Sequence, residues 1–366
     1  MALSADSGGT CARLETADFM RTDELDFDLP AERIAREPCR PRDASRLMVV
    51  HRSDGRLEHR VFRDLPEYLT ARDCLIFNTT RVLPARLVTR RRTGGRIEGL
   101  FLEESRPGRW RVLLNGSRRL KIGEELEFEC GGVRLRLEAR TAEGECEVSI
   151  NPTEDAVAVL NRVGLPPIPP YISRGPDASR DPARDRADYQ TVYAEAPGSV
   201  AAPTAGLHFT PELLANIAAR GVARADVLLH VGLGTFAPIA ADDLTGHFMH
   251  EEWNCLTAES AATIEACRAG GGRRVAVGTT SVRTLESRAK DGGRLRVGDE
   301  KTNIFIYPPY SFKIVDALVT NFHLPRSSLL ALVMAFGGIE LIRRAYREAI
   351  DQGYRFYSFG DAMLIV

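Results

Sequence analysis

Two histidines in loops of small residues are the side chains best placed to do chemistry. His208 lies in segment 200–210, Val-Ala-Ala-Pro-Thr-Ala-Gly-Leu-His-Phe-Thr, directly before a helix start at residues 210–212. His230 lies in segment 229–236, Leu-His-Val-Gly-Leu-Gly-Thr-Phe, beside glycines at a strand end. Small residues let a ligand approach the backbone closely, and an imidazole exchanges a proton near neutral pH. We therefore predict that His208 or His230 is a general base. A structural role for either histidine is the alternative.

Three further segments offer groups that could hold a substrate. Val277-Gly278-Thr279-Thr280-Ser281 follows a predicted strand and opens a predicted helix, so its N–H groups and hydroxyls could bind a carboxylate, phosphate or ribose, with Arg283 nearby. It is neither a Walker A loop nor a G-x-G-x-x-G motif, and a plain strand-to-helix turn is the alternative. Asn321 and His323 stand in a comparable position. The pair His250-Glu251 could serve in acid–base catalysis or lie on the surface.

The elements that position these loops alternate between helix and strand after residue 155. This alternation predicts a largely parallel sheet covered by helices. Helices are expected at 211–220, 258–268, 281–290, 326–337 and 339–351, and strands at 47–51, 74–77, 224–231, 273–277, 304–307 and 314–319. Ligands of such sheets bind beyond the carboxyl ends of the strands. Loops 204–210, 232–236, 278–283 and 321–325 are predicted to meet there.

Residues 85–150 have a different pattern. Short alternating segments are separated by Gly94-Gly95, Pro107-Gly108, Asn115-Gly116 and Gly131-Gly132, which are typical of hairpin turns. We therefore predict an α/β protein with a barrel-like α/β catalytic domain, discontinuous at 18–84 and 151–366. A small antiparallel β-barrel is inserted at 85–150, and residues 1–17 form a flexible N-terminal extension.

Composition excludes several classes of protein. A net charge of -1 over 366 residues gives no global nucleic-acid footprint, so any RNA contact must be local. The seven cysteines are scattered without a C-x-x-C pair, as in reduced cytosolic proteins. The sequence has no secretory signal and no long apolar run, so a cytoplasmic protein without membrane contact is predicted. His247 and His250 lack the H-E-x-x-H context, and no metal site is predicted.

The chain resembles the S-adenosylmethionine:tRNA ribosyltransferase-isomerase family, which makes epoxyqueuosine in tRNA. The resemblance covers nearly everything from 18 to 366. It rests on segments 26–30 (Asp-Phe-Asp-Leu-Pro), 78–87 (Asn-Thr-Thr-Arg-Val-Leu-Pro-Ala-Arg-Leu), 166–171, 189–193 (Tyr-Gln-Thr-Val-Tyr), 203–209, 229–236, 277–287, 302–308, 315–325 and 354–365.

The resemblance implies a reaction and a set of site residues. The ribosyl part of S-adenosylmethionine moves onto 7-aminomethyl-7-deazaguanine at the tRNA wobble position and is isomerised, while adenine and methionine leave. S-adenosylmethionine is consumed as a co-substrate, and no metal or other cofactor is expected. The expected catalytic residues are His208, His230, His250 and Glu251. The expected S-adenosylmethionine-binding residues are Thr204, Gly206, Gly232, Gly234, Thr235, Gly278, Thr279, Thr280, Ser281, Arg283, Asn321 and His323.

The predicted tRNA contacts lie on or beside the inserted barrel, which has a mild excess of basic residues. They are Arg81, Arg86, Arg90, Arg91, Arg92, Arg118 and Arg119, with a solvated β surface as the alternative. A monomer is expected. Two other functions are kept open. An S-adenosylmethionine-dependent tRNA base methyltransferase of unusual fold would not release adenine, and an RNA-binding module would have no catalysis.

Overall fold

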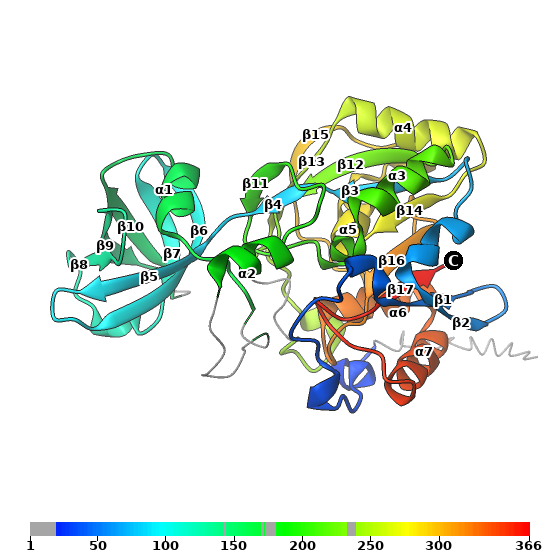
Figure 1. The fold of residues 1–366 in the computed structure, drawn as a ribbon, viewed down its shortest axis with the longest axis horizontal. Coiled ribbons are helices and arrows are strands. Elements are labelled where there is room, and N and C mark those ends of the chain that lie inside the picture. The colour runs from blue at the N-terminus through cyan, green and yellow to red at the C-terminus, as the bar shows by residue number, and fades with distance from the viewer. Residues whose placement is uncertain (1–19, 142–143, 170–171, 173–180, 233–238) are drawn as a thin grey trace, which may run out of the picture.

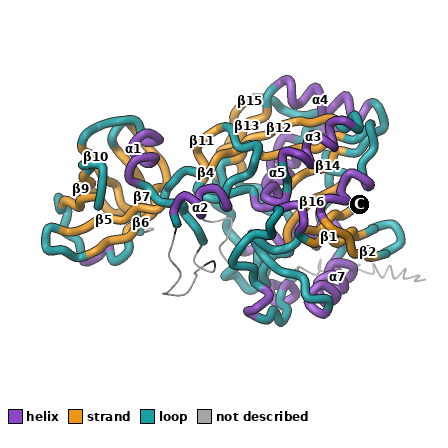
Figure 2. The backbone as a smooth tube through the Cα atoms, viewed as in Figure 1, coloured by secondary structure: helices purple, strands orange, loops and turns teal. Residues whose placement is uncertain are grey.

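The structure, a computed structural model, describes residues 20–141, 144–169, 172, 181–232 and 239–366. Two units lie side by side along the long axis of the molecule (Figure 1). The larger is built on a nine-stranded sheet, and the smaller is a closed barrel of six strands. A two-stranded sheet lies between them. Most helices belong to the larger unit, whereas the smaller unit consists mainly of strands and loops (Figure 2).

The large sheet has a parallel centre. Its order is β15-β13-β12-β3-β14-β16-β17-β1-β2. The strands are β1 (Arg46–Val50), β2 (Leu57–Val61), β3 (Cys74–Asn78), β12 (Ala223–Leu229), β13 (Glu252–Leu256), β14 (Arg274–Val277), β15 (Gly298–Thr302), β16 (Ala317–Asn321) and β17 (Ala362–Ile365). β12, β3, β14 and β16 are parallel neighbours, as are β17 and β1. The four other neighbouring pairs are antiparallel, so the predicted largely parallel sheet is in fact mixed.

Both faces of this sheet are buried, because alternate side chains of each central strand point to opposite layers. Cys74 and Ile76 of β3 face one hydrophobic cluster, while Leu75 and Phe77 face another. The first cluster contains side chains of α4 (Ala258–Ala269), α5 (Thr279–Arg288), α6 (Ser328–Gly337) and α7 (Ile339–Asp351). The second contains side chains of α3 (Pro211–Ala219) and the 3-10 helix η4 (Phe62–Tyr68). The layers thus hold the central strands, and their carboxyl ends, in fixed positions.

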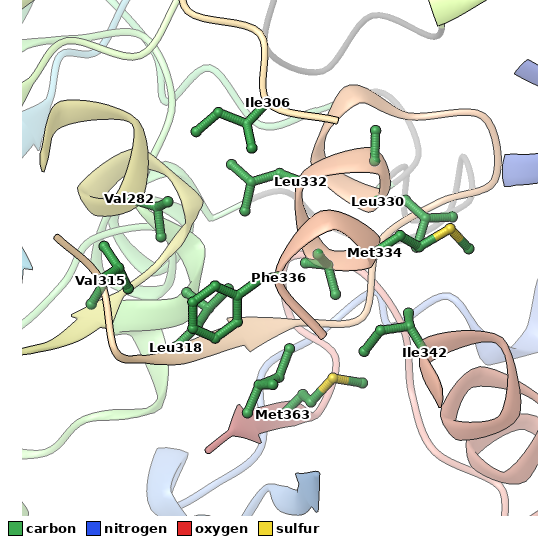
Figure 3. Close-up of a cluster of buried hydrophobic side chains, with 14 of the residues drawn as sticks. Val282, Ile306, Val315, Leu318, Leu330, Leu332, Met334, Phe336, Ile342 and Met363 are labelled. Atoms are coloured by element: carbon green, nitrogen blue, oxygen red, sulfur yellow. The ribbon is translucent and has the colours of Figure 1, made fainter. Parts of the chain in front are cut away.

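Helix α6 lies at the centre of the first cluster. Nine of its ten residues are buried, as expected for a helix that is apolar all round. Figure 3 shows Leu332 and Phe336 of α6 among side chains of α5, β16 and β17. Ser327 begins the helix by accepting a hydrogen bond from the Leu330 N–H at 3.2 Å.

The barrel has the order β10-β7-β6-β5-β8-β9, with every neighbouring pair antiparallel. Its strands are β5 (Arg86–Arg91), β6 (Arg96–Arg106), β7 (Arg109–Leu114), β8 (Glu125–Phe128), β9 (Arg134–Arg140) and β10 (Cys146–Asn151). Alternate residues fill the interior, as Trp110, Val112 and Leu114 do on β7. All six strands lie within residues 85–151, where the sequence shows short alternating segments separated by predicted hairpin turns.

The barrel unit continues past residue 150, where the inserted domain was predicted to end. Helix α1 (Ala156–Val163) packs Val159, Leu160 and Val163 into the barrel core. Arg86 and Leu165 exchange two backbone hydrogen bonds, of 2.9 and 3.0 Å. The chain therefore enters and leaves the barrel side by side, and the packing places the end of this unit near residue 164.

A two-stranded parallel sheet, here called the connector, joins the two units. It consists of β4 (Thr80–Val82), which leads into the barrel, and β11 (Ala196–Ser199). Helix α2 (Pro182–Asp188) lies below it in Figure 1. The remaining short elements are the 3-10 helices η1 (Thr22–Leu25), η2 (Ala31–Arg33), η3 (Arg42–Ala44), η5 (Ser117–Arg119), η7 (Thr204–His208), η9 (Leu244–Gly246) and η10 (Asp291–Gly293).

The α/β class with an inserted small barrel is confirmed. The predicted strand at 304–307 is wrong, because this segment is irregular and β15 forms just before it. Side chains satisfy its backbone instead of a strand partner: Ile304 N–H donates to Thr302 Oγ1 at 3.2 Å, and Ile304 O accepts from Arg283. The predicted extension at 1–17 lies outside the described residues. No helix in the described parts of the chain has the length and apolar character needed to span a bilayer.

Candidate functional site

The predicted loops meet at the carboxyl edge of the parallel strands. His230 follows β12, Gly278 follows β14, and Asn321 ends β16. The 3-10 helix η7 is not part of the sheet but also lies at this edge, where Thr204 Oγ1 donates a hydrogen bond to Asn321 Oδ1 at 3.2 Å. A recess between these segments is lined by 202–205, Val231, 278–280, 320–321, His323 and Leu329. The recess brings together residues that lie more than 100 positions apart.

The start of α5 forms one wall of this recess. Gly278 has φ +89°, a left-handed conformation that favours glycine, and no side chain caps the first turn of the helix. Ser281 Oγ donates back to Val277 O at 2.8 Å, and Thr279 is buried. Thr280 is also buried, and its Oγ1 has no hydrogen-bond partner among the described residues. The helix therefore presents free backbone donors and one unused hydroxyl to the recess.

Arg283 lies one turn further along α5 in a buried ion pair. Its Nη1 contacts Glu252 Oε2, and its Nε donates to Ile304 O at 3.2 Å. Glu252 also accepts a hydrogen bond from Gly232 N–H at 2.9 Å, so the pair fixes the backbone two residues after His230. Within the described chain, Arg283 Nη2 is buried without a partner. One donor of this guanidinium is thus unused.

His230 is half-buried and held on several sides. Thr80 Oγ1 lies 3.0 Å from its Nδ1, and the Trp253 ring stacks on it at 4.6 Å with an interplanar angle of 25°. No described residue forms a hydrogen bond with its Nε2. Burial lowers the pKa of His230, so the ring is neutral at physiological pH. A neutral imidazole with one free nitrogen can accept a proton.

His208 is fully engaged. Its Nδ1 lies 2.8 Å from Ser45 Oγ and its Nε2 lies 3.2 Å from Asn321 Nδ2. Asn321 Nδ2 also faces the Tyr357 carbonyl at 3.2 Å, which identifies it as a donor, so His208 Nε2 accepts and Nδ1 carries the hydrogen. The ring stacks on Phe62 at 4.9 Å. Burial, with the positive charges of Arg355 and Arg42, lowers the pKa of His208 to about 3.

Three other predicted residues have structural partners. Asn321 links η7 to the C-terminal segment through the contacts just described. His323 Nε2 lies 3.0 Å from Thr320 Oγ1, and burial lowers the pKa of His323 to about 3. A Cβ on Gly206 would lie 1.8 Å from Tyr193 Oη, so close packing requires glycine there. Packing against Tyr193 is therefore sufficient to explain the glycine at position 206, and the glycine alone does not indicate a ligand-binding role.

The pair His250-Glu251 lies apart from the recess. Both residues are exposed; His250 contacts Phe248, and Glu251 is 3.7 Å from Lys301. The next residue, Glu252, is the buried carboxylate that reaches Arg283. Gly234 and Thr235 lie outside the described residues. Among the described residues, no group of three or more metal-ligating side chains is close enough to hold a metal ion.

The predicted tRNA-binding arginines fall into two groups. Arg86, Arg90 and Arg91 form ion pairs of 2.6 to 2.8 Å with glutamates. The others are exposed and have no carboxylate partner among the described residues: Arg81, Arg92, Arg118 and Arg119. Only the second group keeps its whole hydrogen-bonding capacity for a phosphate.

Three residues that shape the site, Thr80, Glu252 and Trp253, were not among the residues predicted from the sequence. Thr80 begins a strand of only three residues, and β13 follows a loop and was not predicted at all. The alternation of polar and apolar residues along Glu-Trp-Asn-Cys could have indicated a strand, but it would have placed Trp253 inward, whereas the buried residues are Glu252 and Asn254.

Known proteins match nearly the whole chain. A family model described as queuosine biosynthesis protein matches residues 22–365. A relative from Symbiobacterium thermophilum, named S-adenosylmethionine:tRNA ribosyltransferase-isomerase, is 53% identical over 348 residues, which is 95% of this chain and all of the relative. A relative of the same name from Thermotoga petrophila is 48% identical over 350 residues, again 95% of this chain and all of the relative. The crystal structure of S-adenosylmethionine tRNA ribosyltransferase from Thermotoga maritima is similar with a TM-score of 0.54 and 40% identity, covering 94% of this chain and 100% of that one.

Proposed function

This chain belongs to the queuosine biosynthesis protein family and is an S-adenosylmethionine:tRNA ribosyltransferase-isomerase, and we propose that its reaction takes place at the recess beyond β12, β14 and β16. The ribosyl unit of S-adenosylmethionine is transferred to the aminomethyl group of 7-aminomethyl-7-deazaguanine at the tRNA wobble position. Adenine and methionine leave, and the transferred unit is isomerised to give epoxyqueuosine. The relatives' names give no support to the methyltransferase alternative or to a non-catalytic RNA-binding module.

The start of α5 is the proposed site for the methionine carboxylate. Its uncapped first turn favours an anion, and two buried donors, Thr280 Oγ1 and Arg283 Nη2, have no partner in the described chain. A buried donor without a partner is unfavourable by about 1–3 kcal/mol, which a bound carboxylate would remove. These unused donors support the assignment of Gly278, Thr279, Thr280 and Arg283. Glu252, already paired with Arg283, orients the guanidinium.

His230 is the proposed general base. The sulfonium of S-adenosylmethionine acidifies the protons on C5′, and a neutral imidazole can take one of them. The proton moves from C5′ to Nε2, which leaves a sulfur ylide with no net charge and an imidazolium, so the net charge of the site does not change. The observation that supports this assignment is that no described residue bonds Nε2 of His230, whereas both ring nitrogens of His208 are bonded.

Adenine release during turnover tests this proposal. Replacing His230 with Ala should lower the rate by about 10²–10⁴, the usual contribution of a general base, with binding of tRNA within a few-fold of wild type. His208→Ala serves as the matched control, because it removes the other candidate imidazole. Near-normal adenine release by His230→Ala would refute the base assignment, and formation of methylated tRNA without adenine would refute the reaction itself.

The barrel is proposed to contact the tRNA backbone. The anticodon loop must be held against the recess, and Arg81, Arg92, Arg118 and Arg119 are exposed cations without carboxylate partners in the described chain. The other predicted arginines are neutralised by glutamates and are expected to contribute less.

Three further expectations remain proposals. S-adenosylmethionine is the only small-molecule co-substrate, with no metal or other cofactor, so activity should survive treatment with a chelator. The enzyme acts as a monomer, which sedimentation at assay concentrations would check. Its location is the cytoplasm, which cell fractionation would check.

A further inference from the structure

The described residues around the imidazole of His230 contact its faces and Nδ1 but form no hydrogen bond with Nε2. Trp253 stacks on one face of the ring, and Thr80 Oγ1 lies against Nδ1. A Cβ built on Gly198 would lie 2.4 Å from both Cε1 and Nε2 and 2.7 Å from Cδ2. These nearly equal distances place the Gly198 backbone over a ring face rather than in the ring plane, where Nε2 would be much the nearest atom. Of the described residues, none forms a hydrogen bond at the edge that carries Nε2.

Two of these contacts come from the connector. Thr80 begins β4 and Gly198 lies in β11, and the two strands pair in parallel from Ala196 opposite Thr80 to Ser199 opposite Val82. Buried Asn78 fixes the connector to the sheet: its Oδ1 accepts from Thr80 N–H at 3.2 Å and from Leu229 N–H at 3.1 Å, and its Nδ2 donates to Leu229 O at 3.0 Å. Asn78 thus fixes the backbone positions of both Thr80 and Leu229, the residue before His230.

We propose that Thr80 and Gly198 are positioning residues for His230. Thr80 Oγ1 accepts the Nδ1 hydrogen and so keeps the lone pair on Nε2, while Gly198 leaves room for the ring to stack flat between the connector and Trp253. The proposal rests on the proposed role of His230 as base. The tautomer of a histidine follows from the hydrogen bond made by its other nitrogen, and a proton can be taken only by the nitrogen that lacks one.

Nitrogen NMR of the imidazole tests the tautomer without reference to catalysis. In the wild-type protein, Nδ1 of His230 should be protonated and Nε2 should not. Thr80→Val keeps the side-chain shape but removes the acceptor, so the Nε2-protonated form should increase. Thr80→Ser should restore the wild-type tautomer. Thr89→Val is the matched control, because it removes a buried threonine hydroxyl bonded to Ile97 O inside the barrel, away from His230.

Turnover provides the second measurement. Thr80→Val should lower kcat for adenine release by about 10–100-fold, a part of the general-base contribution, with KM for S-adenosylmethionine within about two-fold, and Thr80→Ser should recover most of the rate. Gly198→Ala should lower kcat similarly and change the ring-current shift that Trp253 imposes on His230.

The outcomes separate this proposal from the base assignment. An unchanged tautomer in Thr80→Val would overturn the positioning role, even if turnover fell. A changed tautomer with wild-type turnover would overturn the positioning role and the base assignment together. A changed tautomer with reduced turnover, rescued by serine, would support both.

Discussion

The segments around His208 and His230 differ in how much hydrogen-bonding capacity they leave unused. At His208, Ser45 and Asn321 occupy both ring nitrogens, and the ring is stacked beneath Phe62. At His230, Thr80 contacts one nitrogen, and no described residue bonds the other. Both imidazoles are kept neutral by burial, so protonation state does not distinguish them. The candidate base therefore differs from the structural histidine in having a ring nitrogen that no described residue bonds, and not in burial or a lowered pKa.

The two segments also differ in what supports them. The backbone after His230 is held by a buried charge pair, whereas η7 is held by neutral hydrogen bonds. Arg283→Ala would remove the buried ion pair of the Glu252 carboxylate with Arg283, and the free energy of unfolding should fall by about 3–5 kcal/mol. Chemical denaturation measures this loss.

The double variant Arg283→Met with Glu252→Gln is the control for that prediction. It removes both charges, so its loss of stability should be clearly smaller than the sum of the single changes. Additive losses would mean that the buried pair does not couple the two residues.

Removing the engaged histidine should affect stability more than catalysis. His208→Ala removes the hydrogen bond of Ser45 Oγ to the imidazole and one of the hydrogen bonds of Asn321 Nδ2, which should reduce the free energy of unfolding by about 1–3 kcal/mol. Its rate of adenine release, once corrected for the folded fraction, should stay within a few-fold of wild type. A rate loss as large as that of His230→Ala would remove the distinction between the two histidines.

Acid should destabilise the protein through the same histidine. His208 has a pKa of about 3 when folded and about 6.5 when unfolded, so between these values the unfolded chain binds a proton that the folded chain does not. Its contribution is present above pH 6.5 and is lost as the pH falls toward 3, by about 1.4 kcal/mol for each pH unit. His208→Gln removes the titrating group, so the slope of unfolding free energy against pH should fall by the contribution of one bound proton, about 1.4 kcal/mol per pH unit. An unchanged slope of unfolding free energy against pH would contradict the buried, neutral state.

The smallest expected effect is on tRNA binding by arginines of the barrel. Replacing Arg92, Arg118 and Arg119 with Ala should weaken tRNA binding and lower the salt slope by about 2–3, since each phosphate contact contributes about 0.7–0.9. The matched variant lacks Arg90, Arg91 and Arg96, which are paired with glutamates, and it has the same change in net charge. It should keep a slope nearer to that of wild type. Equal slopes would mean that ion pairing does not decide which arginines bind tRNA.

Local patterns predicted the barrel strands and most helices, because alternation and helix caps depend only on residues that are close together in the sequence. Thr210, Thr257 and Ser327 all cap helices as their residue types indicate. The polar edge strand β15, Gly-Asp-Glu-Lys-Thr, has no hydrophobic pattern and forms only because β13 provides a partner. The apolar run at 304–306 is buried or half-buried without being a strand, which hydrophobicity alone does not distinguish.

The site was predictable as a set of loops but not as a set of contacts. Parallel strands must bring their carboxyl ends together, so residues 230–232, 278–280 and 321–323 could be grouped from the sequence. The roles within the group depend on partners far along the chain, such as Ser45 for His208 and Thr80 for His230. The sequence alone left His250-Glu251 open between acid–base catalysis and a surface position, whereas in the structure the neighbouring Glu252 is the buried carboxylate.

The role of His230 as base can be tested by following the proton that it removes from C5′. S-adenosylmethionine carrying deuterium at C5′ should lose one deuterium to solvent for each turnover by the wild-type enzyme, because a base removes it. His230→Ala should lose deuterium at least 100-fold more slowly, in line with the usual contribution of about 10²–10⁴, whereas His208→Ala should lose it near the wild-type rate. Loss of deuterium at the wild-type rate by His230→Ala would contradict the account.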